Sequence, residues 1–229
     1  STINIGSYPT PGLIQENGKG LFNYLNRQIF TMIERPMKLS VKPLKRTKLE
    51  FEEGKVHAYF PELWEKLPGD KADYTISEPI FFKKVILFTR KPSTLTNLED
   101  FKNNLLGLVA GYSYGKAIAN RNDLNLSYQE NDDTNIRLLA NHRIDGVLGG
   151  FPSTVMSVNN SAHKHLIQYD LDKPVAVLES FYVCPNTAQG QNLCKDISKG
   201  IQKLKEIGAL MINPVNGNSK FDPSILRGN

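Results

Sequence analysis

The heptapeptide GKVHAYF at residues 54–60 indicates the fold of this chain, because a segment of the same character returns as HRIDGVL at residues 142–148. Each segment follows a helix-like pattern and ends in a short apolar run. Short apolar runs bounded by turn residues are typical of buried strands. Two such helix–strand steps predict an α/β protein with two units, each containing a mostly parallel sheet.

The first half of the chain continues this alternation of strands and helices. Apolar residues recur at helical spacing from Leu21 to Met32, and Pro36 ends that helix. Thr47 and Glu50 have the spacing of a capping box, and Gly54 is placed to end the helix that follows. The predicted strands are 3–6, 38–44, 56–60 and 85–89, and the predicted helices are 21–32 and 48–53.

The second half repeats the pattern and closes with a long amphipathic helix that includes Leu193, Ile197, Ile201 and Leu204. Its predicted strands are 105–110, 144–148 and 175–183, and its predicted helices are 113–120 and 133–141. In open α/β sheets, ligands bind beyond the carboxyl ends of the strands. We therefore expect a ligand-binding cleft where two such sheet edges face each other.

Composition and charge narrow the possible functions. The 229 residues are 40% hydrophobic and 22% charged, as in soluble globular proteins. No apolar run approaches the ~18 residues that span a bilayer. The net charge is +5 and the pI is about 9.1, but the densest basic cluster, between Lys42 and Lys48, has no interleaved aromatic residues. We therefore expect no nucleic-acid partner.

Cys184 and Cys194 are the two cysteines of the chain. The chain starts at Ser1 and not at a methionine, so we expect that an N-terminal signal segment has been removed. An even cysteine count in an exported chain predicts one disulfide formed in an oxidising compartment. The alternative is a pair of buried free thiols.

Five segments, taken in order, resemble a known family over nearly the whole chain. They are the loop 6–21 with Tyr8-Pro9 and Glu16-Asn17-Gly18, FEEGKVHAYF at 51–60, ISEPIFFKKVILFTRK at 76–91, LEDFKNNLLGLVAGYSYGKAI at 98–118 and NHRIDGVLGGFPS at 141–153. This ordered set resembles the bacterial extracellular solute-binding proteins of family 3, the periplasmic receptors of amino-acid ABC transporters.

The resemblance implies the type II periplasmic-binding-protein fold, with two α/β lobes joined by two hinge strands. Lobe 1 would comprise residues 1–89 and 185–229, lobe 2 would comprise residues 90–184, and the hinge strands would lie near Phe88–Lys91 and Phe181–Pro185. It further implies a periplasmic monomer without a cofactor, which captures a small polar ligand between the lobes and delivers it to an ABC transporter permease. The alternatives are the sensing domain of a membrane receptor and, with less support, a periplasmic enzyme on this fold.

Two departures from the family argue against a standard α-amino acid as ligand. The family arginine that clamps the ligand carboxylate precedes the Ser-Glu-Pro segment, but the stretch Pro68–Asp73 contains no arginine. Lys71 lacks the planar guanidinium that a bidentate clamp needs. The family aspartate that takes the ligand ammonium lies five residues beyond Asp145, where this chain has Gly150.

The remaining family positions give candidate ligand contacts in the first lobe. Tyr8 follows the first strand, with packing on its neighbours as the alternative. Pro61, Glu62 and Trp64 replace a serine-rich loop; Glu62 would contact a cationic ligand and Trp64 would stack on it. The alternatives are a solvated carboxylate at Glu62 and core filling at Trp64.

The candidate contacts in the second lobe surround a strand–helix turn. They are Ser113 and Tyr114 in that turn, Gly150 and Phe151 on the facing segment, and Arg90 as a possible anion contact near the hinge. Gly150 would make room for a ligand larger than a simple amino acid. His163 and His165 lack partners for a metal site, and no catalytic motif is present. We expect neither a metal nor an enzyme.

Overall fold

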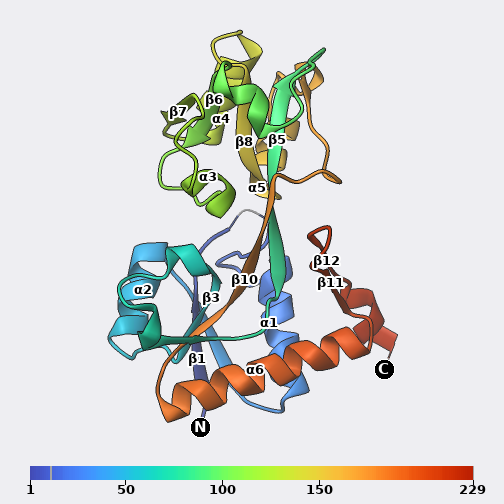
Figure 1. Cartoon of the computed structure of the whole chain (residues 1–229). Helices are drawn as coiled ribbons and strands as arrows, with labels where there is room; N and C mark the ends of the chain where they lie inside the picture. Colours follow the sequence, from blue (N-terminus) through green and yellow to red (C-terminus); the bar gives the residue numbers. More distant parts are fainter. Residues whose placement is uncertain (11, 229) are drawn as a thin grey trace. The chain divides into compact units, whose positions relative to one another are not determined.

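The computed structural model describes residues 1–10 and 12–228, and the chain divides into two compact units (Figure 1). Unit 1 comprises Ser1–Phe82, Glu179–Asn213 and Asn218–Asn229, and unit 2 comprises Lys83–Leu178 and Pro214–Gly217. Each unit combines a sheet with helices, so the α/β class predicted from the sequence is confirmed. In the described part of the chain, no helix is both long and apolar enough to cross a membrane.

The sheet of unit 1 contains three parallel strands. Strand β1 (Ile3–Ser7) lies between β2 (Met37–Val41) and β3 (Ala58–Leu63) and runs parallel to both. Strand β10 (Ala176–Pro185) pairs antiparallel with β3 and with the short β4 (Tyr74–Ile76). The carboxyl ends of β1 and β3 therefore lie at one edge, and Tyr8 and Trp64 each directly follow one of these strands.

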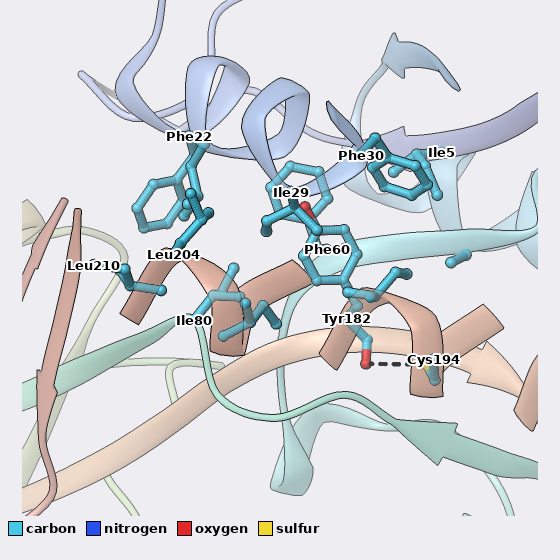
Figure 2. Close-up of a cluster of buried hydrophobic side chains, with 14 of the residues drawn as sticks. Ile5, Phe22, Ile29, Phe30, Phe60, Ile80, Tyr182, Cys194, Leu204 and Leu210 are labelled. Atoms are coloured by element: carbon cyan, nitrogen blue, oxygen red, sulfur yellow. Dashed lines mark hydrogen bonds between the residues drawn. The ribbon is translucent and has the colours of Figure 1, made fainter. Parts of the chain in front are cut away.

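Helices cover both faces of this sheet because its side chains alternate. Phe60 and Tyr182, whose rings stack at 4.4 Å, belong to the core beneath α1 (Leu21–Met32) and α6 (Ala188–Glu206), which Figure 2 shows. Their neighbours Tyr59 and Phe181 point to the other face and pack with Phe51 of α2 (Leu44–Glu52). A period of two in a strand produces this division. The hairpin of β11 (Leu210–Asn213) and β12 (Asn218–Phe221) follows α6.

The strands of unit 2 also have a parallel centre. Strand β6 (Leu106–Val109) runs parallel to β7 (Leu126–Gln129) and to β8 (Gly146–Phe151). Strand β5 (Phe81–Arg90) pairs antiparallel with β8 and with the short β9 (Ile167–Gln168). Helices α4 (Asp132–Ala140) and α5 (Ser153–Asn160) contribute to the core of this unit, whereas α3 (Lys116–Ala119) is a single turn. Short 3-10 helices occur at Leu98–Lys102 and Lys164–Leu166.

The predicted disulfide is confirmed. Cys184 of β10 and Cys194 of α6 are bonded, with their Cα atoms 6.1 Å apart. Both residues are almost fully buried, at 0% and 2% exposure. The bond joins the sheet of unit 1 to its longest helix through the middle of the core, so its role is structural.

Two predictions of local structure are wrong. Thr47 does not cap a helix, because α2 begins three residues earlier, at Leu44; the Thr47 hydroxyl instead donates to the carbonyls of Ser7 and Lys42, at 2.8 and 3.0 Å. The helix predicted at 113–120 is reduced to Lys116–Ala119. Gly115 has φ of +79°, outside the helical region, and this conformation keeps the preceding residues in a turn.

The unit boundaries differ from the predicted lobe boundaries. The sequence placed them after residues 89 and 184, whereas the compact units change at 82/83 and 178/179. The reason is the length of two strands, β5 and β10, which have 10 residues each. Nearly all of β5 packs within unit 2, and most of β10 packs within unit 1. The turn Pro214–Gly217 also groups with unit 2.

Candidate functional site

The carboxyl edge of the unit 1 sheet is held together by hydrogen bonds between distant segments. Ser7, at the end of β1, is fully buried and its hydroxyl donates to the carbonyl of Phe60 at 2.7 Å. Thr47 donates to the Ser7 carbonyl from α2. Sequence analysis missed both residues as parts of the edge, because a serine at a strand end and a threonine inside a helix carry no pattern of their own.

Tyr8 and Pro61 lie together at this edge. The Tyr8 hydroxyl donates to the Pro61 carbonyl at 2.8 Å. Burial, and secondarily the charge of Glu62, raise the pKa of the Tyr8 phenol. Tyr8 is therefore a neutral donor at physiological pH, and its hydroxyl proton is engaged by the Pro61 carbonyl within unit 1. Tyr8 as a whole is partly buried.

Glu62 faces the interior of unit 1, not solvent. Its residue exposure is 5%, and one carboxylate oxygen accepts from the Tyr59 hydroxyl at 2.8 Å and lies 2.9 Å from the Lys48 ammonium. The other oxygen accepts from the backbone N–H of Leu63 at 2.9 Å. Because both oxygens have partners in its own unit, Glu62 organises the loop and is not placed as a ligand contact. The alternative of a solvated loop carboxylate is wrong.

Trp64 is an exposed aromatic residue at the same edge. It begins a short 3-10 turn (Trp64–Lys66) directly after β3, and 42% of it is exposed. The ammonium of Lys71 lies 5.7 Å from the ring centroid, within the range of a cation–π contact. The alternative that Trp64 fills the core is therefore wrong. We call Tyr8, Pro61, Trp64 and Lys71 the unit 1 edge.

In unit 2, the turn after β6 presents two tyrosines with different surroundings. Tyr114 is buried, and its hydroxyl accepts the backbone N–H of Val109 at 2.8 Å; burial raises its pKa. Tyr112 is 45% exposed, and its ring centroid lies 6.4 Å from that of Tyr114. Tyr114 therefore supports the turn, whereas Tyr112 offers the accessible ring.

Lys83 joins this turn to the end of β8. Its ammonium donates to the Ser113 carbonyl at 3.1 Å and lies 5.6 and 5.8 Å from the ring centroids of Tyr112 and Tyr114. Its side chain also passes over Gly150: a Cβ at that position would lie 2.9 Å from Lys83 Cε. The space at Gly150, which the sequence assigned to a larger ligand, thus accommodates the lysine stem.

Lys83 was absent from the sequence-based candidates. It lies in a run of strand residues, and nothing local in that strand distinguishes it from Lys84. We call Lys83, Tyr112, Ser113, Tyr114 and Gly150 the unit 2 edge.

Two other sequence-based candidates in unit 2, Phe151 and Arg90, have contacts within the unit that indicate a structural role. Phe151 ends β8 and packs, half-buried, against the core of the unit. Arg90 ends β5, and because Thr89 pairs with Gly146 it lies beside the start of β8, whereas Lys84 pairs with Phe151 at the other end. The Arg90 guanidinium donates to the Leu139 carbonyl at 2.7 Å. The structure thus separates Arg90 from the unit 2 edge, and we leave it out of the candidate site.

The two edges contain no metal-binding cluster among their described residues. Among the described residues, no group of three histidine, cysteine, aspartate or glutamate side chains is arranged to hold a metal ion. What the two edges share is an exposed aromatic ring beside a lysine ammonium, placed after the end of a parallel strand. Such a surface provides a flat face for stacking and a positive charge for a hydrogen-bond acceptor.

The fold is that of the two-lobed periplasmic binding proteins. The L-cystine solute receptor of Neisseria gonorrhoeae, in its unliganded open form, superposes with a TM-score of 0.70 at 14% identity, covering 90% of this chain and 88% of the receptor. The GluR0 ligand-binding core from Nostoc punctiforme, in complex with L-glutamate, gives 0.65 at 17% identity, covering 90% and 94%. A histidine kinase sensor domain gives 0.67 at 18% identity, covering 90% and 91%.

At these low identities, the TM-scores establish a shared fold. No protein-family model and no curated protein sequence matches the chain. The ligand therefore has to be argued from the residues at the two edges.

Proposed function

We propose that this chain is a periplasmic solute-binding protein that captures a small polar ligand and delivers it to an ABC transporter. The observation that carries the proposal is the repeated arrangement of the two edges: Trp64 beside Lys71 in unit 1, and Tyr112 beside Lys83 in unit 2. Large aromatic rings are normally buried or half-buried. Their exposure at the sheet edge where α/β proteins bind ligands is the expected property of a recognition surface.

The chemistry of the edges also favours a class of ligand. Both edges offer ring faces and ammonium groups, and the carboxylate that sequence analysis placed at the first edge, Glu62, is already paired internally. A ligand with a planar or apolar face and with carbonyl or anionic oxygens complements such groups. A free α-amino acid is a poorer match, because residues 68–73 lack an arginine and position 150 lacks a carboxylate.

Delivery to a transporter permease, action as a monomer, and binding without chemical change of the ligand are further parts of the proposal. Among the solved structures with this fold is a substrate-binding domain of a putative amino acid ABC transporter from Streptococcus pneumoniae, at a TM-score of 0.67 and 16% identity. The sensor domain of a histidine kinase, at 18% identity, supports one alternative: an extracytoplasmic sensing domain. The gene sequence beyond Asn229 separates the two, since a sensor requires a transmembrane helix and a signalling domain.

The proposal is tested by identifying a ligand and then removing the rings that would hold it. Small molecules released by denaturing the purified protein are identified by mass spectrometry and titrated back by calorimetry. A ligand that binds the folded state must also raise the melting temperature in a concentration-dependent way. Twenty standard amino acids form the arm in which we expect weak binding or none. The proposal fails if nothing is released and no compound of a broad metabolite panel raises the melting temperature.

Matched aromatic variants test the two edges separately. Trp64→Ala and Tyr112→Ala should each weaken binding of the identified ligand at least tenfold, because a stacked anchor is lost. Tyr128→Ala is the control: Tyr128 is 58% exposed but belongs to the outer strand β7 of unit 2. Equal effects of the Tyr112 and Tyr128 substitutions would exclude the unit 2 edge as a recognition surface.

A further inference from the structure

Among the described residues, the buried side-chain polar atoms that lack a hydrogen-bond partner all lie on one helix of unit 2. In the described part of the chain they are Oδ1 of Asp132 and both amide atoms, Oδ1 and Nδ2, of Asn135. The two residues stand three apart on α4, and residues at this spacing share one face of a helix. The concentration of all three atoms at one place indicates a common cause.

These atoms are buried. Asn135 is 0% exposed and Asp132 is 6% exposed. The Asn135 amide lies against β6, where a Cβ at Gly107 would come within 2.6 Å of its oxygen, so only glycine leaves room for it. Ile136 and Leu139, on the same helix, belong to the apolar core of unit 2 and offer no polar partner. Buried polar groups without partners are costly, and folded proteins satisfy nearly all of them with protein atoms or ordered water.

The second oxygen of Asp132 is already used. It accepts from the Thr154 hydroxyl at 3.0 Å, and the same hydroxyl oxygen accepts the backbone N–H of Gly150 at 2.8 Å. Thr154 is itself fully buried. A hydrogen-bonded relay thus runs from Gly150, in the unit 2 edge, through Thr154 to Asp132, and it ends at the unpaired Oδ1.

We propose that Asp132 and Asn135 form an internal hydration site in unit 2 that holds ordered water. The chemistry selects water: two of the three atoms are acceptors that need donors, whereas Nδ2 is a donor that needs an acceptor. Water meets both demands, because one molecule donates to Asp132 Oδ1 and accepts from Asn135 Nδ2, and a second proton from the hydration site serves Asn135 Oδ1. A metal ion or an ammonium group satisfies only the two oxygens and leaves Nδ2 unpaired. The hydration site anchors the relay that holds Gly150 and does not depend on the proposed ligand.

A crystal structure of the full chain, at a resolution that shows ordered solvent, tests the site directly. We expect a density peak within hydrogen-bond distance, about 2.7–3.2 Å, of both Asp132 Oδ1 and Asn135 Nδ2. Two results overturn the proposal. One is a dry interior with the two side chains bonded to other protein atoms. The other is a peak that contacts only oxygen atoms at shorter, cation-like distances.

A substitution gives a second, independent reading. Asn135→Leu keeps a similar volume and removes the amide. If water satisfies the amide, the variant removes the hydrogen bonds between the amide and the buried water, and the melting temperature falls. If the amide is truly unsatisfied, its removal relieves a penalty, and the melting temperature stays or rises. Arg137→Leu, at an exposed position of α4, is the control for a leucine introduced on this helix and should shift the melting temperature little. Should Asn135→Leu fail to fold, the crystal structure of the unaltered chain still decides.

Discussion

Replacing Glu62 with glutamine should destabilise unit 1 without acting through the ligand. The carboxylate is 6% exposed at its side chain and forms an ion pair with Lys48 at 2.9 Å, whereas the Lys48 side chain remains 24% exposed. It also accepts from Tyr59 and from the backbone of Leu63. Glutamine keeps the shape of the side chain but has no charge and only one acceptor oxygen.

The expected loss follows from these contacts. The charge-assisted bond to Lys48 contributes about 1.5–3 kcal/mol, and the loss of one acceptor leaves either Tyr59 or Leu63 unpaired at a cost of about 1 kcal/mol. Partial exposure of Lys48 screens the pair and keeps the cost below the ~3–5 kcal/mol of a fully buried pair that loses one partner. We therefore expect Glu62→Gln to lower the free energy of unfolding of unit 1 by about 2–4 kcal/mol.

Urea unfolding followed by tryptophan fluorescence measures this change, because Trp64 is the single tryptophan and lies in unit 1. Glu65→Gln, an exposed neutralisation in the same loop, is the matched control and should stay within about 0.5 kcal/mol of wild type. A double-mutant cycle with Lys48→Met should show coupling between positions 48 and 62. The reasoning is refuted if Glu62→Gln unfolds like wild type yet binds a cationic ligand more weakly.

Three further predictions concern other parts of the structure. Trp64→Ala should change the free energy of unfolding by less than about 1 kcal/mol, since the ring is 42% exposed; a larger loss in circular-dichroism melts would show that the ring supports the core. The denatured, unreduced protein should contain no thiol that reacts with an alkylating reagent, and replacing Cys184 and Cys194 by alanine should cost about 2–3 kcal/mol; two alkylated thiols would disprove the bond. Burial raises the pKa of Tyr59 and of Tyr182, so their contribution to stability is complete below the unfolded tyrosine pKa of about 10 and is lost above it. The part of the phenolate absorbance that comes from these buried tyrosines should therefore appear together with unfolding in an alkaline titration, and ionisation of all tyrosines in the folded protein would contradict this.

The class of fold was predictable from local patterns. Alternation of apolar residues at strand and helix periods depends only on neighbours in the chain, which is why the apolar spacing from Leu21 to Met32 predicted helix α1. The cysteine pair was predictable for a similar reason, since few pairings exist for two cysteines. Short outer elements such as β7 and the β11–β12 hairpin were missed, because strands of four residues carry too little pattern.

The candidate site was predictable only as a set of positions. Tyr8, Pro61, Trp64, Ser113, Tyr114 and Gly150 all fall at sheet edges, where the strand–loop order of an α/β chain must put them. Their roles did not follow from order alone. Trp64 and Glu62 stand two residues apart in one loop, yet one is exposed and the other faces Tyr59 and Lys48 inside the unit.

By itself, the sequence determined the two-unit α/β architecture, the disulfide and the loops that reach the sheet edges, because each depends on local periodicity or on residue type. Only the tertiary structure decided which side chains meet. Lys83 reaches the carbonyl of Ser113 across 30 residues, and Thr154 reaches Asp132 across 22. Such contacts depend on how strands pair and how helices pack over them. The placement of the Lys83 ammonium at the unit 2 edge and the pairing of Thr154 with Asp132 therefore arise from distances in space that no spacing in the chain records.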